Sequence, residues 1–144
     1  MSLDPGLLEL RNRTYAAFVD LGRAPAAAEL GDEQEVKAAW RLLHEAHALV
    51  LDPATAELRM ANPFSAVPTA YRVQAGGRWW YGNCAWDAFG IPAALGVDGR
   101  VESSCPDCGE PYVVEVRGGA VDRGDLWFHC LVPAAHWWDD IVFT

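Results

Sequence analysis

The chain has 144 residues, of which 51% are hydrophobic and 11% aromatic, and it carries a formal net charge of -9 with a pI near 4.7. This apolar content excludes a disordered chain, and so acidic a surface makes nucleic acid a poor partner. The first residues lack the basic start and apolar core of a secretory signal, and no apolar run approaches the roughly 20 residues that span a bilayer. We therefore expect a cytoplasmic protein with no membrane partner.

Three helices are predicted in the first part of the chain. Apolar residues at helical spacing run from Leu7 to Leu21, and a shorter helix is expected over 25–30. Asp32 and Glu35, three residues apart, predict the start of a third helix. The expected apolar face of this third helix consists of Val36, Trp40, Leu43 and His47.

A β-hairpin is predicted after these helices. Two apolar runs, 48–51 and 57–60, flank an Asp-Pro turn. Three helices followed by a hairpin are typical of a winged helix, whose usual role is DNA binding. Residues 1–62, however, carry six basic against ten acidic side chains, a net charge of -4. This balance favours a structural subdomain over a DNA reader.

The second part of the chain is predicted to be an antiparallel sheet with short helices. The two-proline connector 62–68 is the expected boundary, which gives a winged-helix-like subdomain over 1–62 and an α+β core domain over 63–144. Strands are expected over 69–74, 78–82, 100–104, 112–117 and 126–131, with helices over 85–95 and 133–141.

Cys84 lies at the predicted junction between a strand and the helix over 85–95. A cysteine at a helix N-terminus faces unpaired N–H groups and the positive end of the dipole, which favour thiolate over thiol. Asp87 follows three residues later and shares its helix face. The pair is a candidate site that holds a metal or carbon electrophile beside a proton donor. The alternative is a small buried cysteine and an aspartate that complements the dipole.

A second pair of cysteines, Cys105 and Cys108, forms a C-x-x-C turn that can point two sulfurs at one ion. Structural zinc normally needs four ligands. Cys130 or His129 could complete a set, although neighbours on a strand point to opposite faces. Zinc or copper binding, a redox pair and a turn without metal all stay open.

Four segments then occur in order along the chain: 63–69 (Pro-Phe-Ser-Ala-Val-Pro-Thr), 80–87 (Trp-Tyr-Gly-Asn-Cys-Ala-Trp-Asp), 100–105 (Arg-Val-Glu-Ser-Ser-Cys) and 132–138 (Val-Pro-Ala-Ala-His-Trp-Trp). Together they resemble the organomercurial (alkylmercury) lyases over nearly the whole chain. The Cys-Ala-x-Asp segment in its Phe-Ser and Arg-Val-Glu-Ser context is the most specific feature. The resemblance implies an alkylmercury lyase-like α+β fold, with a winged-helix-like N-terminal region.

The resemblance also implies protonolysis of a carbon–mercury bond. A first cysteine captures R–Hg⁺ because mercury is a soft cation, a second weakens the C–Hg bond, and an aspartic acid protonates the departing carbon. By position, Cys84 matches the first cysteine, Asp87 the aspartate, and Cys105 a cysteine with a mainly structural role. The reaction implies no organic cofactor, and the partner is a small organometallic substrate or a soft metal ion, with mercury as substrate and product.

The family's second catalytic cysteine has no clear counterpart. The stretch from Val121 to Gly124 holds no cysteine, Cys130 is the nearest one, and Cys108 is an extra residue. We therefore expect a divergent member in which Cys84, Asp87 and Cys130 are catalytic. The candidate metal ligands are Cys84, Cys105, Cys108 and Cys130. A non-catalytic soft-metal binding protein of the same fold and a metal-responsive winged-helix regulator are the alternatives. The sequence does not indicate an oligomeric state.

Overall fold

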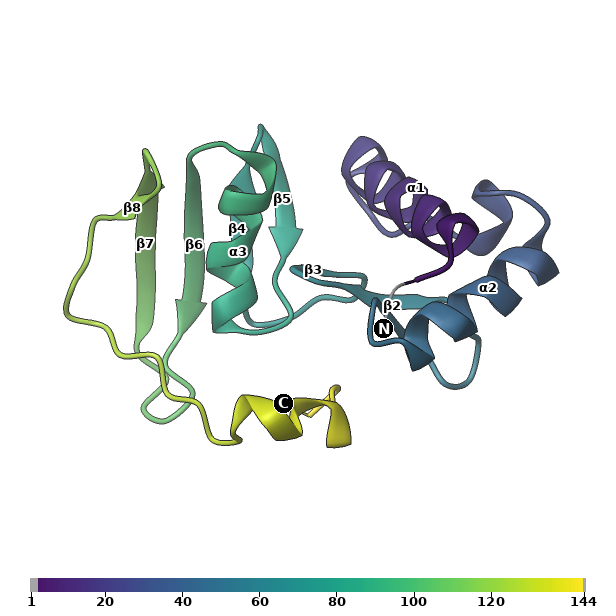
Figure 1. The fold of residues 1–144 in the computed structure, drawn as a ribbon. Helices are drawn as coiled ribbons and strands as arrows, with labels where there is room; N and C mark the ends of the chain where they lie inside the picture. The colour runs from purple at the N-terminus through teal and green to yellow at the C-terminus, as the bar shows by residue number, and fades with distance from the viewer. Residues whose placement is uncertain (1–2, 144) are drawn as a thin grey trace. The chain divides into compact units, whose positions relative to one another are not determined.

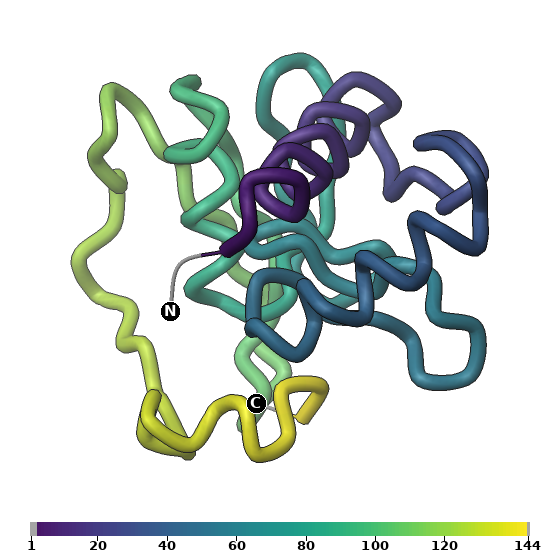
Figure 2. Tube along the Cα trace, turned by 45° about the vertical axis from the view of Figure 1, so that its right-hand side comes forward, coloured from purple at the N-terminus to yellow at the C-terminus, as the bar shows by residue number. Residues whose placement is uncertain are grey.

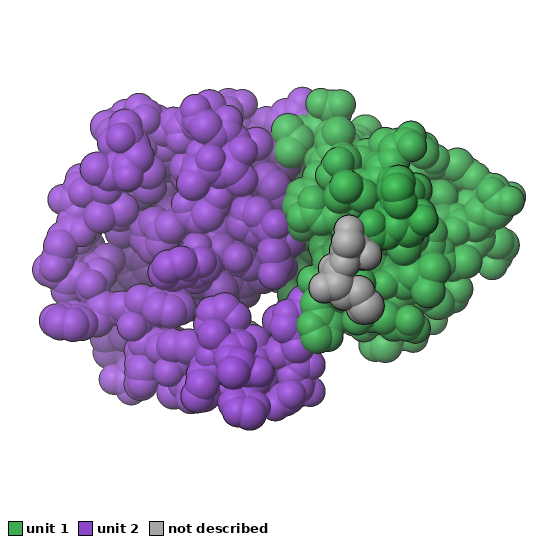
Figure 3. Space-filling view, in the orientation of Figure 1, with its two compact units in different colours: residues 1–61 green, residues 62–144 purple. Residues whose placement is uncertain are grey.

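The computed structural model describes residues 3–143, and the chain divides into two compact units, residues 1–61 and 62–144 (Figure 3). Helices occur in both units, and the strands pair antiparallel. This mixture confirms the α+β class. The winged-helix-like assignment of the first part of the chain stays a prediction.

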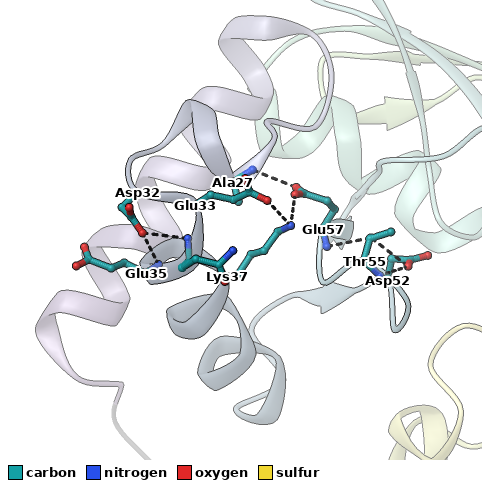
Figure 4. Close-up of polar contacts among 9 residues, drawn as sticks. Ala27, Asp32, Glu33, Glu35, Lys37, Asp52, Thr55 and Glu57 are labelled. Atoms are coloured by element: carbon teal, nitrogen blue, oxygen red, sulfur yellow. Dashed lines mark hydrogen bonds and ion pairs between the residues drawn. The ribbon is translucent and has the colours of Figure 1, made fainter.

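The first unit begins with two long helices, α1 (Pro5–Leu21) and α2 (Glu33–Glu45) (Figure 1). The Asp32 side chain caps α2 by accepting hydrogen bonds from the backbone N–H groups of Gln34 and Glu35, each at 3.1 Å (Figure 4). The capping signals in the sequence therefore predicted this helix start correctly.

Two details of these helices differ from the prediction. The helix expected over 25–30 is only the single 3₁₀ turn η1 (Ala27–Glu29). His47 does not extend the apolar face of α2, because the helix ends at Glu45 and His47 lies beyond it in a left-handed conformation with φ 60°. The apolar positions in the sequence keep their helical spacing as far as His47, but the backbone leaves the helix after Glu45 and turns toward the hairpin.

The core of the first unit joins α1 and α2 through a buried hydrogen bond. Trp40, fully buried, donates from Nε1 to Thr14 Oγ1 at 3.0 Å, and Thr14 donates to the Leu10 carbonyl at 2.8 Å. The Trp40 indole N–H and the Thr14 hydroxyl therefore both have hydrogen-bond partners inside the core, away from water.

The hairpin predicted after α2 consists of β1 (Val50–Leu51) and β2 (Leu58–Ala61). Lys37 of α2 lies 2.7 Å from Glu33 and 2.9 Å from Glu57, which precedes β2 (Figure 4). Glu57 also accepts a hydrogen bond from the Ala27 N–H at 3.0 Å. One acidic side chain therefore ties η1, α2 and the hairpin together.

The second unit contains a five-stranded antiparallel sheet with the order β5-β4-β6-β7-β8 (Figure 1). Its strands are β4 (Arg72–Ala75), β5 (Arg78–Tyr81), β6 (Gly99–Ser104), β7 (Pro111–Arg117) and β8 (Ala120–Val121), and the short strand β3 (Phe64–Ser65) precedes them. Val73 pairs with Trp80 on one side and Val101 on the other, and Val101 pairs with Val114. All four side chains are buried and form a row across the sheet.

The helix α3 (Ala85–Leu95) packs against β4 and β6. Its buried residues Ala88, Ile91 and Pro92 supply the other half of this core. Because Ala88 and Ile91 are three positions apart, they lie on one face of α3 and set its rotation on the sheet.

The strand predicted over 126–131 is absent. After β8 the chain runs without helix or strand from 122 to 133 until the 3₁₀ helix η2 (Ala134–Asp139) (Figure 2). Trp127 is 95% and Leu131 78% exposed, so the apolar run that suggested a strand does not form a buried face. The two-residue strand β8, which the sequence did not suggest, takes the edge position beside β7 instead.

No helix among residues 3–143 combines the length and the apolar character needed to cross a membrane.

Gly82 connects β5 to the start of α3 and has no room for a side chain. Its N–H donates to the Tyr71 carbonyl at 3.0 Å, and its carbonyl accepts from Thr69 Oγ1 at 2.6 Å. A Cβ at this position would lie 2.7 Å from the backbone nitrogen and 2.9 Å from the Cα of Ala88. The backbone of β5 therefore approaches α3 as closely as only glycine permits.

Gly82→Ala is accordingly expected to lower the free energy of unfolding by about 1–3 kcal/mol, the usual cost of overpacking. Urea unfolding followed by circular dichroism measures this change. Gly124→Ala is the matched control, since no atom of the described residues lies within 4 Å of a Cβ at that position. Equal stability of the two variants would contradict the close packing described.

Candidate active site

Cys84 and Asp87 lie together at the start of α3. Cys84 is the N-cap residue of this helix, directly after β5, Gly82 and Asn83, and Asp87 lies in its first turn. The predicted strand-to-helix junction is therefore present. The Cys84 side chain is partly exposed, and so is that of Asp87. Both side chains are therefore partly shielded from water and still accessible from solvent.

The electrostatics of the Cys84 sulfur differ from the sequence-based expectation. Burial raises the pKa of the Cys84 thiol above its ordinary value. The backbone N–H groups of Asp87 and Trp86 lower this pKa, although the sulfur makes no capping hydrogen bond. The helix N-terminus thus acts in the predicted direction, but desolvation outweighs it, and negative charge on Asp87 adds to the upward shift.

Asp87 accepts a hydrogen bond at Oδ2 from the Asn83 side-chain amide at 3.0 Å. Burial raises the pKa of the Asp87 carboxyl, and the hydrogen bond from Asn83 partly offsets this by stabilising the charged form. The carboxyl therefore keeps its proton to higher pH than an exposed aspartate does. A perturbed carboxyl beside a cysteine has the features of a proton donor.

Asn83 was not singled out in the sequence, yet it connects Asp87 to the segment before β3. Its Nδ2 group also lies 3.2 Å from Asn62 Oδ1, 3.4 Å from the Pro63 carbonyl and 3.3 Å from the Phe64 carbonyl. The Asn83 amide therefore donates both to the 62–64 segment and to the Asp87 carboxyl. Asn83 is therefore a positioning residue for Asp87.

Tyr71 also lies in the electrostatic environment of Cys84. Burial raises the pKa of Tyr71, and negative charges on Tyr112 and Cys84 raise it further. Tyr71 precedes β4, and Tyr112 belongs to β7. The sequence carried no signal for this grouping, because strand pairing brings together residues that are distant along the chain.

Cys130 lies in the irregular segment after β8 and is exposed. Its thiol donates a hydrogen bond to the Val132 carbonyl at 2.9 Å. Negative charge on Cys130 raises the pKa of Cys84, and the rings of Phe128 and Trp86 contact each other with centroids 5.8 Å apart. This segment therefore runs near the start of α3, as a loop and not as the predicted strand.

The Cys105–Cys108 turn connects β6 to β7, with Cys105 partly exposed and Cys108 exposed. Across residues 3–143, no three or more His, Cys, Asp or Glu side chains come together in an arrangement that could hold a metal ion. The zinc set in which Cys130 or His129 would complete this turn is therefore not formed. The physical reason is that His129 and Cys130 lie on an exposed loop instead of a neighbouring strand.

The alkylmercury lyase (MerB) family model matches residues 64–144, more than half of the chain. The chain belongs to the alkylmercury lyase family. Membership confirms the resemblance drawn from the Cys84 segment and its neighbours. The matched region contains Cys84, Asp87, Cys105, Cys108 and Cys130.

A solved structure agrees with this family assignment at the level of the fold. The crystal structure of the mercury-bound form of MerB2 is similar with a TM-score of 0.66 and 21% sequence identity, covering 85% of this chain and 61% of that chain. At this identity the likeness concerns the fold alone, and the present chain spans under two thirds of that protein's length. No curated protein matched the sequence.

Asn83→Ala is expected to raise the pKa of Asp87 further, because the variant lacks the amide that stabilises the carboxylate. In an alkylmercury lyase-like site this change extends the protonated form of the acid to higher pH. Carbon-13 NMR titration of the Asp87 carboxyl measures the shift directly. Asn12→Ala, on the exposed surface of α1, is the control, and an unchanged Asp87 pKa in Asn83→Ala would disprove the positioning role.

Proposed function

We propose that this chain captures organomercury at Cys84 and protonates the mercury-bound carbon with Asp87. The observation that carries the proposal is the pair itself, a sulfur at the N-cap of α3 and a partly buried carboxyl in the first turn of the same helix. The family assignment of residues 64–144 supports mercury as the ion. Mercury enters as substrate and leaves as product.

Capture follows from the softness of the ion. A thiolate binds R–Hg⁺ more strongly than oxygen ligands do, so the Cys84 sulfur replaces the ligand that accompanies the organomercury cation. Because the pKa of Cys84 is raised by burial, the sulfur starts mainly as a thiol near neutral pH and must lose a proton when the mercury–sulfur bond forms. A proton acceptor close to Cys84 therefore speeds capture.

Asp87 can serve first as the acceptor and then as the donor of this proton. Its carboxylate can take the proton that leaves Cys84, and its raised pKa favours holding that proton afterwards. Cleavage then breaks the C–Hg bond, with the bonding electron pair staying on carbon and the Asp87 proton forming the new C–H bond. The products are a hydrocarbon and Hg²⁺ bound to thiolate, and no organic cofactor takes part.

Cys130 is the candidate second thiol. Its charge influences the pKa of Cys84, which supports a place within electrostatic reach of the captured ion. A second thiolate adds electron density to mercury and weakens the C–Hg bond. Among the described residues, the Cys130 sulfur makes one hydrogen bond, to the Val132 carbonyl, and it lies on an exposed loop, so the thiol can turn toward another ligand at little cost.

The test is the formation of hydrocarbon from a defined substrate. Protein is incubated with phenylmercury and an excess of a small thiol, and benzene is measured by gas chromatography. Benzene in proportion to protein, with one deuterium per molecule when the solvent is heavy water, is the expected result. Stoichiometric binding of phenylmercury without any benzene would instead identify a non-catalytic soft-metal binding protein.

A further inference from the structure

The turn between β6 and β7 presents two sulfurs that the proposed lyase reaction does not use. Cys105 follows the last residue of β6, and Cys108 lies three residues later in the sequence Cys-Pro-Asp-Cys-Gly. The Cys105 N–H donates to the Glu110 carbonyl at 2.8 Å, and the Gly109 N–H donates to the Cys105 carbonyl at 2.8 Å. These two hydrogen bonds close the turn and hold its backbone in one conformation.

Cys105 and Cys108 are three residues apart in a turn that the Gly109 N–H closes by its hydrogen bond to the Cys105 carbonyl, so both sulfurs start from one short, closed segment of backbone. The neighbouring backbone N–H groups of Cys108 and Asp107 lower the pKa of the Cys105 thiol, whereas burial raises that of Cys84. Cys105 and Cys108 thus form a pre-organised pair of sulfur ligands.

The number of ligands decides which ions fit. No third Cys, His, Asp or Glu joins the pair within residues 3–143, so the four ligands that structural zinc requires are not assembled. Soft ions with a filled d shell, such as Hg²⁺ and Cu⁺, prefer thiolate and are satisfied by two sulfurs in a near-linear arrangement. An exposed pair of thiols admits such an ion directly from solvent.

We propose that Cys105 and Cys108 form a two-thiolate binding site for a two-coordinate soft metal ion, best represented by Hg²⁺, apart from the Cys84 site. Binding converts one Hg²⁺ and two thiols into a dithiolate complex and releases two protons. The site does not depend on lyase activity, because it needs neither Asp87 nor a carbon–mercury bond.

The experiment uses the full chain with the other two sulfurs removed. The double variant Cys84→Ala/Cys130→Ser keeps only Cys105 and Cys108, and the triple variant adds Cys108→Ser. Each protein is mixed with HgCl₂ and excess 2-mercaptoethanol and passed through a desalting column, and mercury is counted by mass spectrometry. A chelating pair outcompetes a free monothiol through its high effective concentration.

The double variant is expected to retain about one Hg²⁺ per chain, and the triple variant less than about a tenth of that. X-ray absorption at the mercury edge is expected to show two sulfur neighbours. Loss of mercury from the double variant, with its circular dichroism unchanged, would overturn the proposal whether or not the wild type cleaves phenylmercury. Three or four sulfur neighbours, supplied by a second chain or by retained 2-mercaptoethanol, would overturn it as well.

Discussion

Replacing Asp87 with asparagine is expected to slow benzene release from phenylmercury by roughly 100- to 10,000-fold, the range that a general acid contributes. Asparagine preserves the side-chain size and an oxygen acceptor for the Asn83 amide, which lies 3.0 Å from Asp87 Oδ2. Cys84 is untouched and its proton can pass to solvent instead of Asp87, so capture of phenylmercury is expected to persist at equilibrium, although it forms more slowly. The variant should therefore separate binding from cleavage.

Two measurements on the same sample check this separation. Benzene is followed by gas chromatography in a single turnover, and the mercury retained per chain is counted after desalting. Asp20→Asn, the same change on the exposed side of α1, is the matched control. Wild-type benzene release by Asp87→Asn would assign the proton to another group.

The Asp87→Asn substitution is also expected to change how the free energy of unfolding depends on pH. Burial raises the folded-state pKa of Asp87. A group with a raised folded pKa contributes stability below its unfolded pKa, and this contribution is lost as the pH rises through the folded pKa. Because asparagine does not titrate, the stability of the variant relative to wild type is expected to be higher at pH 7 than at pH 4. Urea unfolding at both pH values measures the difference.

Cys84→Ala is expected to reduce benzene release by more than about 1,000-fold, as removal of a residue that bonds to the reacting group does in other enzymes. Unlike Asp87→Asn, it is also expected to lose phenylmercury capture at this site. The fold should survive, with a change in the free energy of unfolding within about 1 kcal/mol. The reason is that, within residues 3–143, α3 has no side-chain capping hydrogen bond from Cys84 to lose.

Ser104→Ala, a similar truncation at the exposed end of β6, is the control for Cys84→Ala. Calorimetric titration with phenylmercury in the presence of excess thiol measures capture, and gas chromatography measures release. If Cys84→Ala released benzene at the wild-type rate, the assignment of Cys84 as the mercury ligand would be wrong. Together with Asp87→Asn, this variant distinguishes a binding defect from a proton-transfer defect.

Local signals predicted those elements whose stability depends on neighbours in sequence. Asp32 as a cap predicted the start of α2, and the strands expected over 69–74 and 78–82 predicted the paired strands β4 and β5, all of which are present. The strand predicted over 126–131 is absent because a short apolar run forms a strand only where a neighbouring strand and a core accept it. At that edge β8 pairs with β7, and the segment is left exposed.

In the candidate site, too, some features follow from the sequence and others only from the tertiary structure. The sequence alone determined that Cys84 and Asp87 share the first turn of one helix, because a spacing of three residues implies a common face. The segments around Cys84 also predicted the family to which the chain belongs. Only the tertiary structure brought Asn83 against the 62–64 segment and Tyr71 into the surroundings of the sulfur.

The protonation behaviour of the site was likewise decided by tertiary structure. From the sequence, the helix N-terminus predicted a depressed pKa for Cys84, yet burial raises the pKa of both Cys84 and Asp87. Desolvation depends on all the atoms that exclude water from a group, and these come from distant parts of the chain. Helix position and spacing follow from sequence, whereas the free energy of a charge in its final surroundings follows only from the folded protein.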